Sequence, residues 1–176
     1  MSTHKIIIAG FGGQGVLAMG QMLAYAAMTE GKEVTWMPSY GPEMRGGTAN
    51  CTVIISDKMI ASPIVTRATA VVVMNGPSLE KFQDLVIPGN DLFINASLIT
   101  EKPGRDDVNI HLVDCTGIAN ELQNLKVANM VMLGAVNRVI AAVAESSIRA
   151  AMEKAFTGGK AGLIDLNMKA LNAWRE

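Results

Sequence analysis

The chain has 176 residues, of which 49% are hydrophobic and 18% are charged, and its formal net charge is −1. This composition excludes a disordered chain, and the charge balance excludes the strongly basic surface typical of nucleic-acid-binding proteins. With two cysteines, Cys51 and Cys115, and two histidines, His4 and His111, the chain supports neither a disulfide framework nor a four-cysteine zinc or iron–sulfur site, and we predict no metal site.

The apolar segments are short. The apolar run after Lys5 ends in glycines after four residues, which is too short for a secretory signal. Residues 127–136 are interrupted by Asn129 and are too short to span a bilayer. We therefore expect one domain over residues 1–176, located in the cytoplasm and without a membrane span.

The first forty residues predict a strand–helix–strand unit. Residues 5–9 are a β-branched run that indicates a buried strand. Residues 14–30 are rich in Ala, Met and Leu and predict a helix that ends at Gly31. Residues 33–38 predict a second strand. This order implies that the two strands form a parallel pair with a right-handed crossover.

The next elements predict a change of strand direction. Residues 39–50 contain glycines and a proline and indicate a loop, and residues 51–56 predict a strand. Residues 57–58 resemble a turn into residues 59–65, so we expect an antiparallel pair. Residues 70–74 predict another buried strand.

The rest of the chain predicts two more strands and several helices. The expected elements are a helix from an N-cap at Ser78 to about Leu85, strands at 91–95 and 109–113, one or two helices over 117–143, a helix capped by Ser146 or Ser147 that ends near Phe156, and a helix over 161–174. The predicted fold class is a single Rossmann-like α/β domain. It has six or seven strands in a mostly parallel sheet, helices on both faces and an antiparallel strand pair.

The first glycine-rich loop follows the first strand and opens the first helix. Gly10, Gly12 and Gly15 fit the pattern G-x-G-x-x-G, with Gly13 and Gln14 between them. Glycines allow backbone N–H groups to approach an anion, and the helix start favours negative charge. The alternative is a tight turn that packs the helix closely and binds no ligand.

Two common nucleotide sites are not supported by the pattern. A nicotinamide site needs an acidic residue at the end of the second strand, whereas Glu33 stands at the start of that strand. A P-loop needs a lysine after its last glycine, and none follows here.

The second glycine-rich loop, residues 39–47, leaves the carboxyl end of the second strand. Because the carboxyl ends of parallel strands share one edge of the sheet, we expect the two loops to meet. The candidate ligand-binding residues in this loop are Tyr40, Gly41, Arg45, Gly46 and Gly47. The guanidinium suits a phosphate or a partner's carboxylate, or else it pairs with the acid two residues before it. The tyrosine either stacks on a ligand or partner or anchors the loop.

The remaining polar residues form no recognisable catalytic group, and we predict no catalytic residue on this chain. Asn129 lies in an apolar segment, and a buried amide needs partners. It either bonds a nearby loop backbone or contacts a ligand. Cys51 and Cys115 fit small buried hydrophobic positions.

Together, the two loops resemble the gamma subunit of the 2-oxoacid:acceptor (ferredoxin) oxidoreductases. The resemblance covers almost the whole chain, and residues 39–47 are most similar to the 2-oxoglutarate type. Family members often carry a glycine where this chain has Gln123. The resemblance implies an enzyme complex that converts a 2-oxoacid and coenzyme A to acyl-CoA, carbon dioxide and a reduced acceptor.

The resemblance also implies a division of cofactors and partners. Thiamine diphosphate, magnesium and iron–sulfur clusters are expected on partner subunits, with ferredoxin or another acceptor reached through the complex. The resemblance then implies that this chain alone catalyses no reaction and that it forms a homodimer when isolated. Within the complex, its two loops are expected to contact coenzyme A. The alternatives are a stand-alone nucleotide-binding Rossmann-like enzyme and an assembly module without a ligand.

Overall fold

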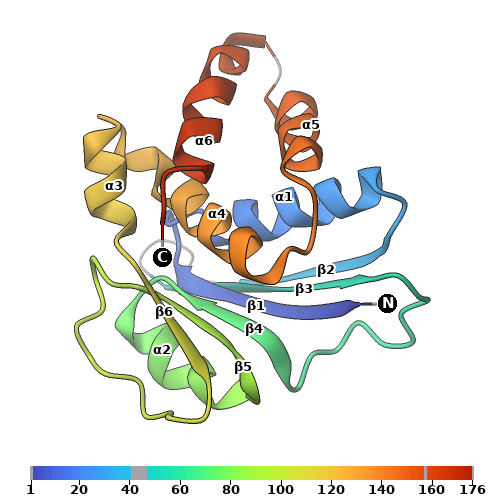
Figure 1. Cartoon of the computed structure of the whole chain (residues 1–176), viewed down its shortest axis with the longest axis vertical. Helices are drawn as coiled ribbons and strands as arrows, with labels where there is room; N and C mark the ends of the chain where they lie inside the picture. Colours follow the sequence, from blue (N-terminus) through green and yellow to red (C-terminus); the bar gives the residue numbers. More distant parts are fainter. Residues whose placement is uncertain (1, 41–46, 157, 176) are drawn as a thin grey trace.

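The computed structural model describes residues 2–40, 47–156 and 158–175. Within this part of the chain, six strands form one sheet in the order β2-β3-β1-β4-β5-β6, with helices on both faces (Figure 1). The strands are β1 (Thr3–Phe11), β2 (Glu33–Tyr40), β3 (Thr48–Ser56), β4 (Ala68–Val73), β5 (Val86–Asn95) and β6 (Asn109–Val113).

In the described structure, α1 and α4 pack on one face of the sheet, α3 and α6 pack against α4, α5 packs against α1, and α2 covers the other face (Figure 1). The α-helices are α1 (Val16–Thr29), α2 (Gly76–Phe82), α3 (Cys115–Glu121), α4 (Ala128–Ile140), α5 (Glu145–Ala155) and α6 (Ile164–Leu171). Three short 3-10 helices join them: η1 (Gln83–Leu85), η2 (Leu125–Val127) and η3 (Gly158–Leu163). The predicted α/β class and the helices on both faces are confirmed.

The strand pairing corrects one prediction. β1 and β2 run in the same direction but do not pair, because β3 lies between them and is antiparallel to both. β1, β4, β5 and β6 pair in parallel. β3 follows β2 in the sequence and pairs beside it. The two strands that we expected to pair in parallel are therefore separated by an antiparallel strand. The carboxyl ends of β1 and β2 still share one edge.

The antiparallel pair was also predicted at the wrong place. Residues 59–65 form no strand, and Met59 is 89% and Ile64 69% exposed. Pro63 lacks the N–H group that a strand ladder needs. The antiparallel partners of β3 are β1 and β2 instead.

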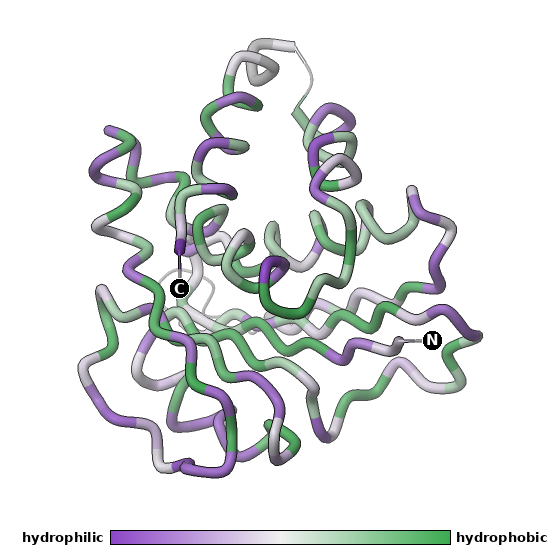
Figure 2. The backbone as a smooth tube through the Cα atoms, viewed as in Figure 1, coloured by the Kyte–Doolittle hydropathy of each residue, from purple (hydrophilic) through white to green (hydrophobic). Residues whose placement is uncertain are grey.

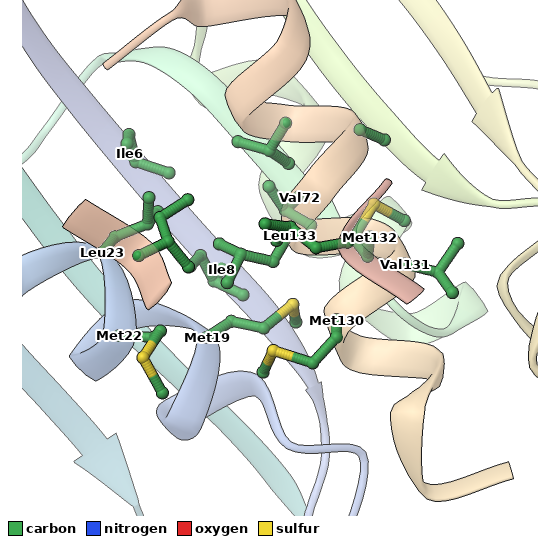
Figure 3. Close-up of a cluster of buried hydrophobic side chains, with 14 of the residues drawn as sticks. Ile6, Ile8, Met19, Met22, Leu23, Val72, Met130, Val131, Met132 and Leu133 are labelled. Atoms are coloured by element: carbon green, nitrogen blue, oxygen red, sulfur yellow. The ribbon is translucent and has the colours of Figure 1, made fainter. Parts of the chain in front are cut away.

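The larger core lies between the sheet and the helices of the first face. Ile6 and Ile8 of β1 lie beside Met19 and Leu23 of α1 and Met130 of α4 (Figure 3). Flexible methionine side chains fill the irregular space where these helices approach the strand.

A smaller core lies on the opposite face, under α2. Ile7 of β1 points there and packs with Val71, Leu92 and Leu79. β1 therefore buries both of its faces, which explains its unbroken apolar run (Figure 2).

Two helix starts differ from the predicted caps. The cap of α2 is Asn75, whose side chain accepts a hydrogen bond from the backbone N–H of Ser78 at 2.9 Å. At the start of α5, neither predicted serine caps the helix. The N-cap is Ala144, whose N–H donates to the Glu30 carboxylate at 2.6 Å. A carboxylate distant in the sequence therefore anchors the residue at which α5 begins.

The helical region over 117–143 consists of two α-helices separated by η2. After α3, Gln123 adopts a positive φ of 57°. Glycine favours this left-handed conformation and side-chain-bearing residues rarely adopt it.

Candidate functional site

The candidate site lies at the carboxyl edge of the sheet, where β1 and β4 end. α1 follows β1 onto one face, and α2 follows β4 onto the other (Figure 1). The two neighbouring strands thus send their helices in opposite directions. In open α/β sheets, this topological switch point is where ligands bind.

The two glycine-rich loops meet at this edge, as predicted. The N–H of Gly12 donates to the carbonyl of Gly47 at 3.1 Å. Tyr40, the last residue of β2, pairs with Ala49 of β3. Three other predicted site residues, Gly41, Arg45 and Gly46, lie outside the described residues.

The glycines of the first loop differ in their surroundings. Gly10 lies within β1, and a Cβ there would meet the side chains of Gln14 and Met74 at 2.7 and 2.9 Å. Gly15 has φ +73° and lies directly under the Asn129 side chain. Neighbouring side chains therefore fill the space beside both glycines. Gly13 is exposed, has φ +96° and leaves open space around it, so it is the position in this loop where a ligand can approach the backbone.

The Gln14 side chain connects two strand ends. Its Oε1 accepts from the N–H of Phe11 at 2.7 Å, and its Nε2 donates to the carbonyl of Met74 at 3.0 Å. The amide thus fixes the end of β1 to the end of β4. Its contribution to a ligand site is to hold the loop in shape.

A cavity lies on each side of the first loop. One has a volume of about 330 Å³ and borders α1 and the start of β3, where the second loop arrives. The other, which we name the switch-point cavity, has a volume of about 490 Å³. It is lined by Gly13, Gln14, Gly15, Met74, Asn95, Leu98, Thr116, Leu125, Lys126, Ala128 and Asn129. Both volumes suit small ligands.

Sequence reasoning missed three polar residues of the switch-point cavity, Asn95, Thr116 and Lys126. A usable signal existed for one of them, because Asn95 is a polar residue at the end of a buried strand. The other two come from the start of α3 and from η2, which only the tertiary fold brings to the first loop. Asn129, for which a ligand contact was one of two alternatives, also lines the cavity.

Asn95 is 1% exposed. Its Nδ2 donates to the carbonyl of Met74 at 3.3 Å, while its buried Oδ1 has no hydrogen-bond partner among the described residues. A buried acceptor without a partner calls for an explanation.

Next to this cavity, the Asp114 carboxylate caps α3. The Ser97 hydroxyl donates to it at 2.6 Å, and the N–H of Gly117 donates at 3.0 Å. These two hydrogen bonds, the serine's first, hold the pKa of Asp114 below its usual value. The carboxylate therefore remains ionised and acts as the N-cap of α3.

The cysteines are buried and free. Burial raises the pKa of both the Cys51 and the Cys115 thiol to about 12, so the nucleophilic thiolate is scarce at neutral pH. In the described ranges, no group of three His, Cys, Asp or Glu side chains is placed to hold a metal ion. No helix in those ranges is long and apolar enough to cross a bilayer.

Comparisons with known proteins cover nearly all of the chain. Residues 5–176 match the family described as pyruvate ferredoxin/flavodoxin oxidoreductase. Ketoisovalerate oxidoreductase subunit VorA of Methanothermobacter thermautotrophicus is 39% identical over 173 residues, which are 98% of this chain and 36% of that protein. The chain thus spans about a third of the length of this first relative.

A second relative is closer in length. The 2-oxoglutarate synthase subunit KorC of Methanocaldococcus jannaschii is 37% identical over 154 residues, 86% of this chain and 80% of that protein. The crystal structure of the keto/oxoacid ferredoxin oxidoreductase gamma subunit from Geobacter sulfurreducens matches with a TM-score of 0.82 and 27% identity. That match covers 97% of this chain and 95% of that one.

Proposed function

Because the chain belongs to the pyruvate ferredoxin/flavodoxin oxidoreductase family, we propose that it acts as the gamma subunit of a 2-oxoacid:ferredoxin oxidoreductase. The complex converts a 2-oxoacid and coenzyme A to acyl-CoA and carbon dioxide, and passes two electrons to ferredoxin or another acceptor. The observation that carries this proposal is the similarity along residues 5–176, supported by a gamma subunit of matching length and fold.

The chemistry of the complex is divided between chains. Thiamine diphosphate stabilises the carbanion formed on decarboxylation, and iron–sulfur clusters carry the electrons. A four-cysteine cluster needs more thiols than Cys51 and Cys115 provide. We therefore assign the iron–sulfur clusters to partner subunits, and we propose that thiamine diphosphate and magnesium are held there as well. This chain is catalytically silent alone and supports the active site within the complex.

The two glycine-rich loops are the proposed contact with coenzyme A. The proposed site is built from Gly10, Gly12, Gly13, Gln14, Gly15, Tyr40, Gly41, Arg45, Gly46 and Gly47. Of these, Gly10, Gln14 and Gly15 give the first loop its shape. Gly13 offers an open approach to the backbone, and the Arg45 guanidinium suits a phosphate. Replacing Arg45 by Ala should raise the KM for coenzyme A about tenfold. An unchanged KM removes this arginine from the contact.

The proposed 2-oxoacid is 2-oxoglutarate. The sequence of the second loop supports it, and so does the similarity to KorC, whereas the similarity to VorA favours a branched 2-oxoacid. Competing the two acids for one enzyme decides between them. 2-Oxoglutarate should have the higher kcat/KM, and a preference for 3-methyl-2-oxobutanoate contradicts the assignment.

The proposal is tested by tagging the chain in its native cell, purifying it gently and identifying co-purifying proteins by mass spectrometry. We expect thiamine-binding and cluster-bearing partners, and dye reduction by the eluate that depends on both 2-oxoacid and coenzyme A. A chain without partners that binds a dinucleotide favours the stand-alone enzyme. A complex in which this chain contacts no small molecule favours the assembly module.

Two further properties belong to the proposal. The chain works in the reducing cytoplasm, which suits its two free thiols. When isolated from its complex, residues 1–176 behave as one domain and self-associate through exposed apolar side chains such as Met28 and Leu163. Sedimentation velocity of the purified chain measures this.

A further inference from the structure

β6 forms one edge of the sheet (Figure 1). The carbonyl of Val113 accepts a hydrogen bond from the N–H of Ala96, directly after β5, at 2.9 Å, so the backbone groups of Val113 face β5. Because these groups alternate in direction along a strand, those of His111 also face β5, whereas the N–H and C=O groups of Ile110 and Leu112 point away from it. In the described sheet, no strand lies on that side.

The same two residues carry exposed apolar side chains. Ile110 and Leu112 pair with Leu92 and Ile94 of β5, which belong to the smaller core under α2. Ile110 and Leu112 therefore continue the apolar surface of that face to the edge of the sheet, yet they are 40% and 61% exposed. A row of outward backbone groups with apolar side chains beside it suits another extended strand.

Edge strands usually carry residues that prevent such pairing. At the opposite edge, β2 contains Pro38, which has no N–H to donate. β6 consists of residues 109–113 and contains no proline, lysine or carboxylate. The side chains of Asn109 and His111 lie on the other face, within 3.3 and 2.9 Å of the Asp91 carboxylate. Nothing in the strand itself therefore opposes a further strand.

The strand is complementary to a second copy of itself. When two β6 strands pair antiparallel about His111, Ile110 of one copy lies opposite the partner's Leu112 on each side of the two-fold axis. The backbone groups of both residues point outward, so each of these two pairs exchanges both of its hydrogen bonds. The same register places an apolar side chain against an apolar side chain in both pairs, and no carboxylate or lysine of β6 opposes another.

We propose that β6 is a self-association edge, through which two copies of this chain join their sheets with the β6 strands antiparallel. The arrangement is isologous and therefore closes at a dimer. It goes beyond the proposed function, because it uses neither glycine-rich loop and differs from a contact of the helical layer through Met28 and Leu163. The strand is short, so we expect a transient dimer with a Kd in the micromolar range or weaker.

The test is residue-resolved amide hydrogen exchange of the full chain over an about hundredfold range of concentration. Exchange at the N–H groups of Ile110 and Leu112 should slow at least about tenfold as the concentration rises. The N–H of His111, which faces β5, should be protected throughout. Sedimentation velocity over the same range should show monomer converting to dimer.

Two variants at one position test the contact itself. Leu112→Pro removes an N–H that β5 does not use, so it should preserve the fold and weaken the dimer at least about tenfold. Leu112→Lys places a charge on the edge and should weaken it similarly without changing the backbone. Met28→Lys makes the same change at an exposed apolar residue of α1 and should leave the concentration-dependent protection of Ile110 and Leu112 intact.

Three results overturn the proposal. The first is exchange at Ile110 and Leu112 that does not depend on concentration. The second is a dimer that survives both Leu112 variants or is lost with Met28→Lys alone, which places the contact on the helical layer. The third is protection of these amides only when other subunits are present, which assigns the edge to a strand of another chain. None of these measurements uses catalytic activity, so failure here leaves the proposed function standing.

Discussion

Gly134 marks the closest approach of α4 and α6, and its replacement by alanine tests how tightly the helical layer is packed. A Cβ at this position would lie 2.6 Å from the carbonyl carbon of Leu171 and 2.9 Å from its Cα, and nearer still to its carbonyl oxygen. Ordinary contacts begin at 3.4 Å. Because the obstacle is backbone, no side-chain rotation relieves the clash, and the carbonyl end of α6 must withdraw by well over 1 Å to reach an ordinary contact.

Two effects of this substitution oppose each other. Alanine in a helix interior gains about 1 kcal/mol over glycine, whereas overpacking a core costs about 1–3 kcal/mol and occasionally more. Backbone contact places Gly134→Ala at the costly end. We expect a net loss of about 2 kcal/mol in the free energy of unfolding, which lowers Tm by about 4–8 °C in a chain of this length.

The assay is thermal and urea unfolding followed by circular dichroism. Gly162→Ala is the matched control, since a Cβ there meets nothing within 4 Å. It should change the free energy of unfolding by less than about 0.5 kcal/mol. If Gly134→Ala is neutral or stabilising, the close packing of α4 on α6 is refuted.

Three further predictions concern stability and thiol reactivity. Gln123→Gly should stabilise the chain by about 0.5–1 kcal/mol in urea unfolding, because it relieves a left-handed backbone; a loss of stability contradicts this. The lowered pKa of Asp114 stabilises the fold at pH values above the pKa of the unfolded chain, and this stabilisation is lost as the pH falls through the folded-state pKa. Because the Ser97 hydrogen bond is the main cause of the lowered pKa, Ser97→Ala should raise the pKa of Asp114 in a carboxyl NMR titration. An unmoved pKa removes the serine as its cause. Cys51 and Cys115 should resist alkylation at pH 8 in the native state and react after denaturation, so rapid native labelling would contradict their burial.

Local sequence patterns predicted most elements because a run of apolar residues directly reflects the burial of a strand or helix. Residues 6–9 are all apolar, and each is at most 2% exposed because β1 lies between two layers. The strands at 70–74, 91–95 and 109–113 were found for similar reasons, as β4, β5 and β6.

Strand pairing was not predictable from the same patterns, because neighbours in a sheet are chosen by contacts distant in sequence. β3 pairs with β1 from Thr48 opposite Phe11 to Ser56 opposite Thr3. Nothing near the first strand indicates this insertion. Residues 59–65 mislead for the opposite reason, since Met59 and Ile64 are apolar yet exposed.

The candidate site was predicted in part. The meeting of the two loops follows from strand direction, and the Gly12–Gly47 hydrogen bond agrees with it. The far wall of the switch-point cavity, with Asn95 and Lys126, was missed. These residues lie near the first loop only because of the tertiary positions of β5 and α4. No spacing in the local sequence indicates this proximity.

The central claim is that this chain is a required but silent subunit of a 2-oxoacid oxidoreductase. The most direct measurement is oxoacid- and coenzyme-A-dependent dye reduction by the complex assembled from separately purified subunits, with and without this chain. The chain alone should show no activity, the complex lacking it should be inactive, and adding it back should restore turnover in proportion to the amount bound. Full activity without the chain, or no recovery on adding it, would contradict the claim.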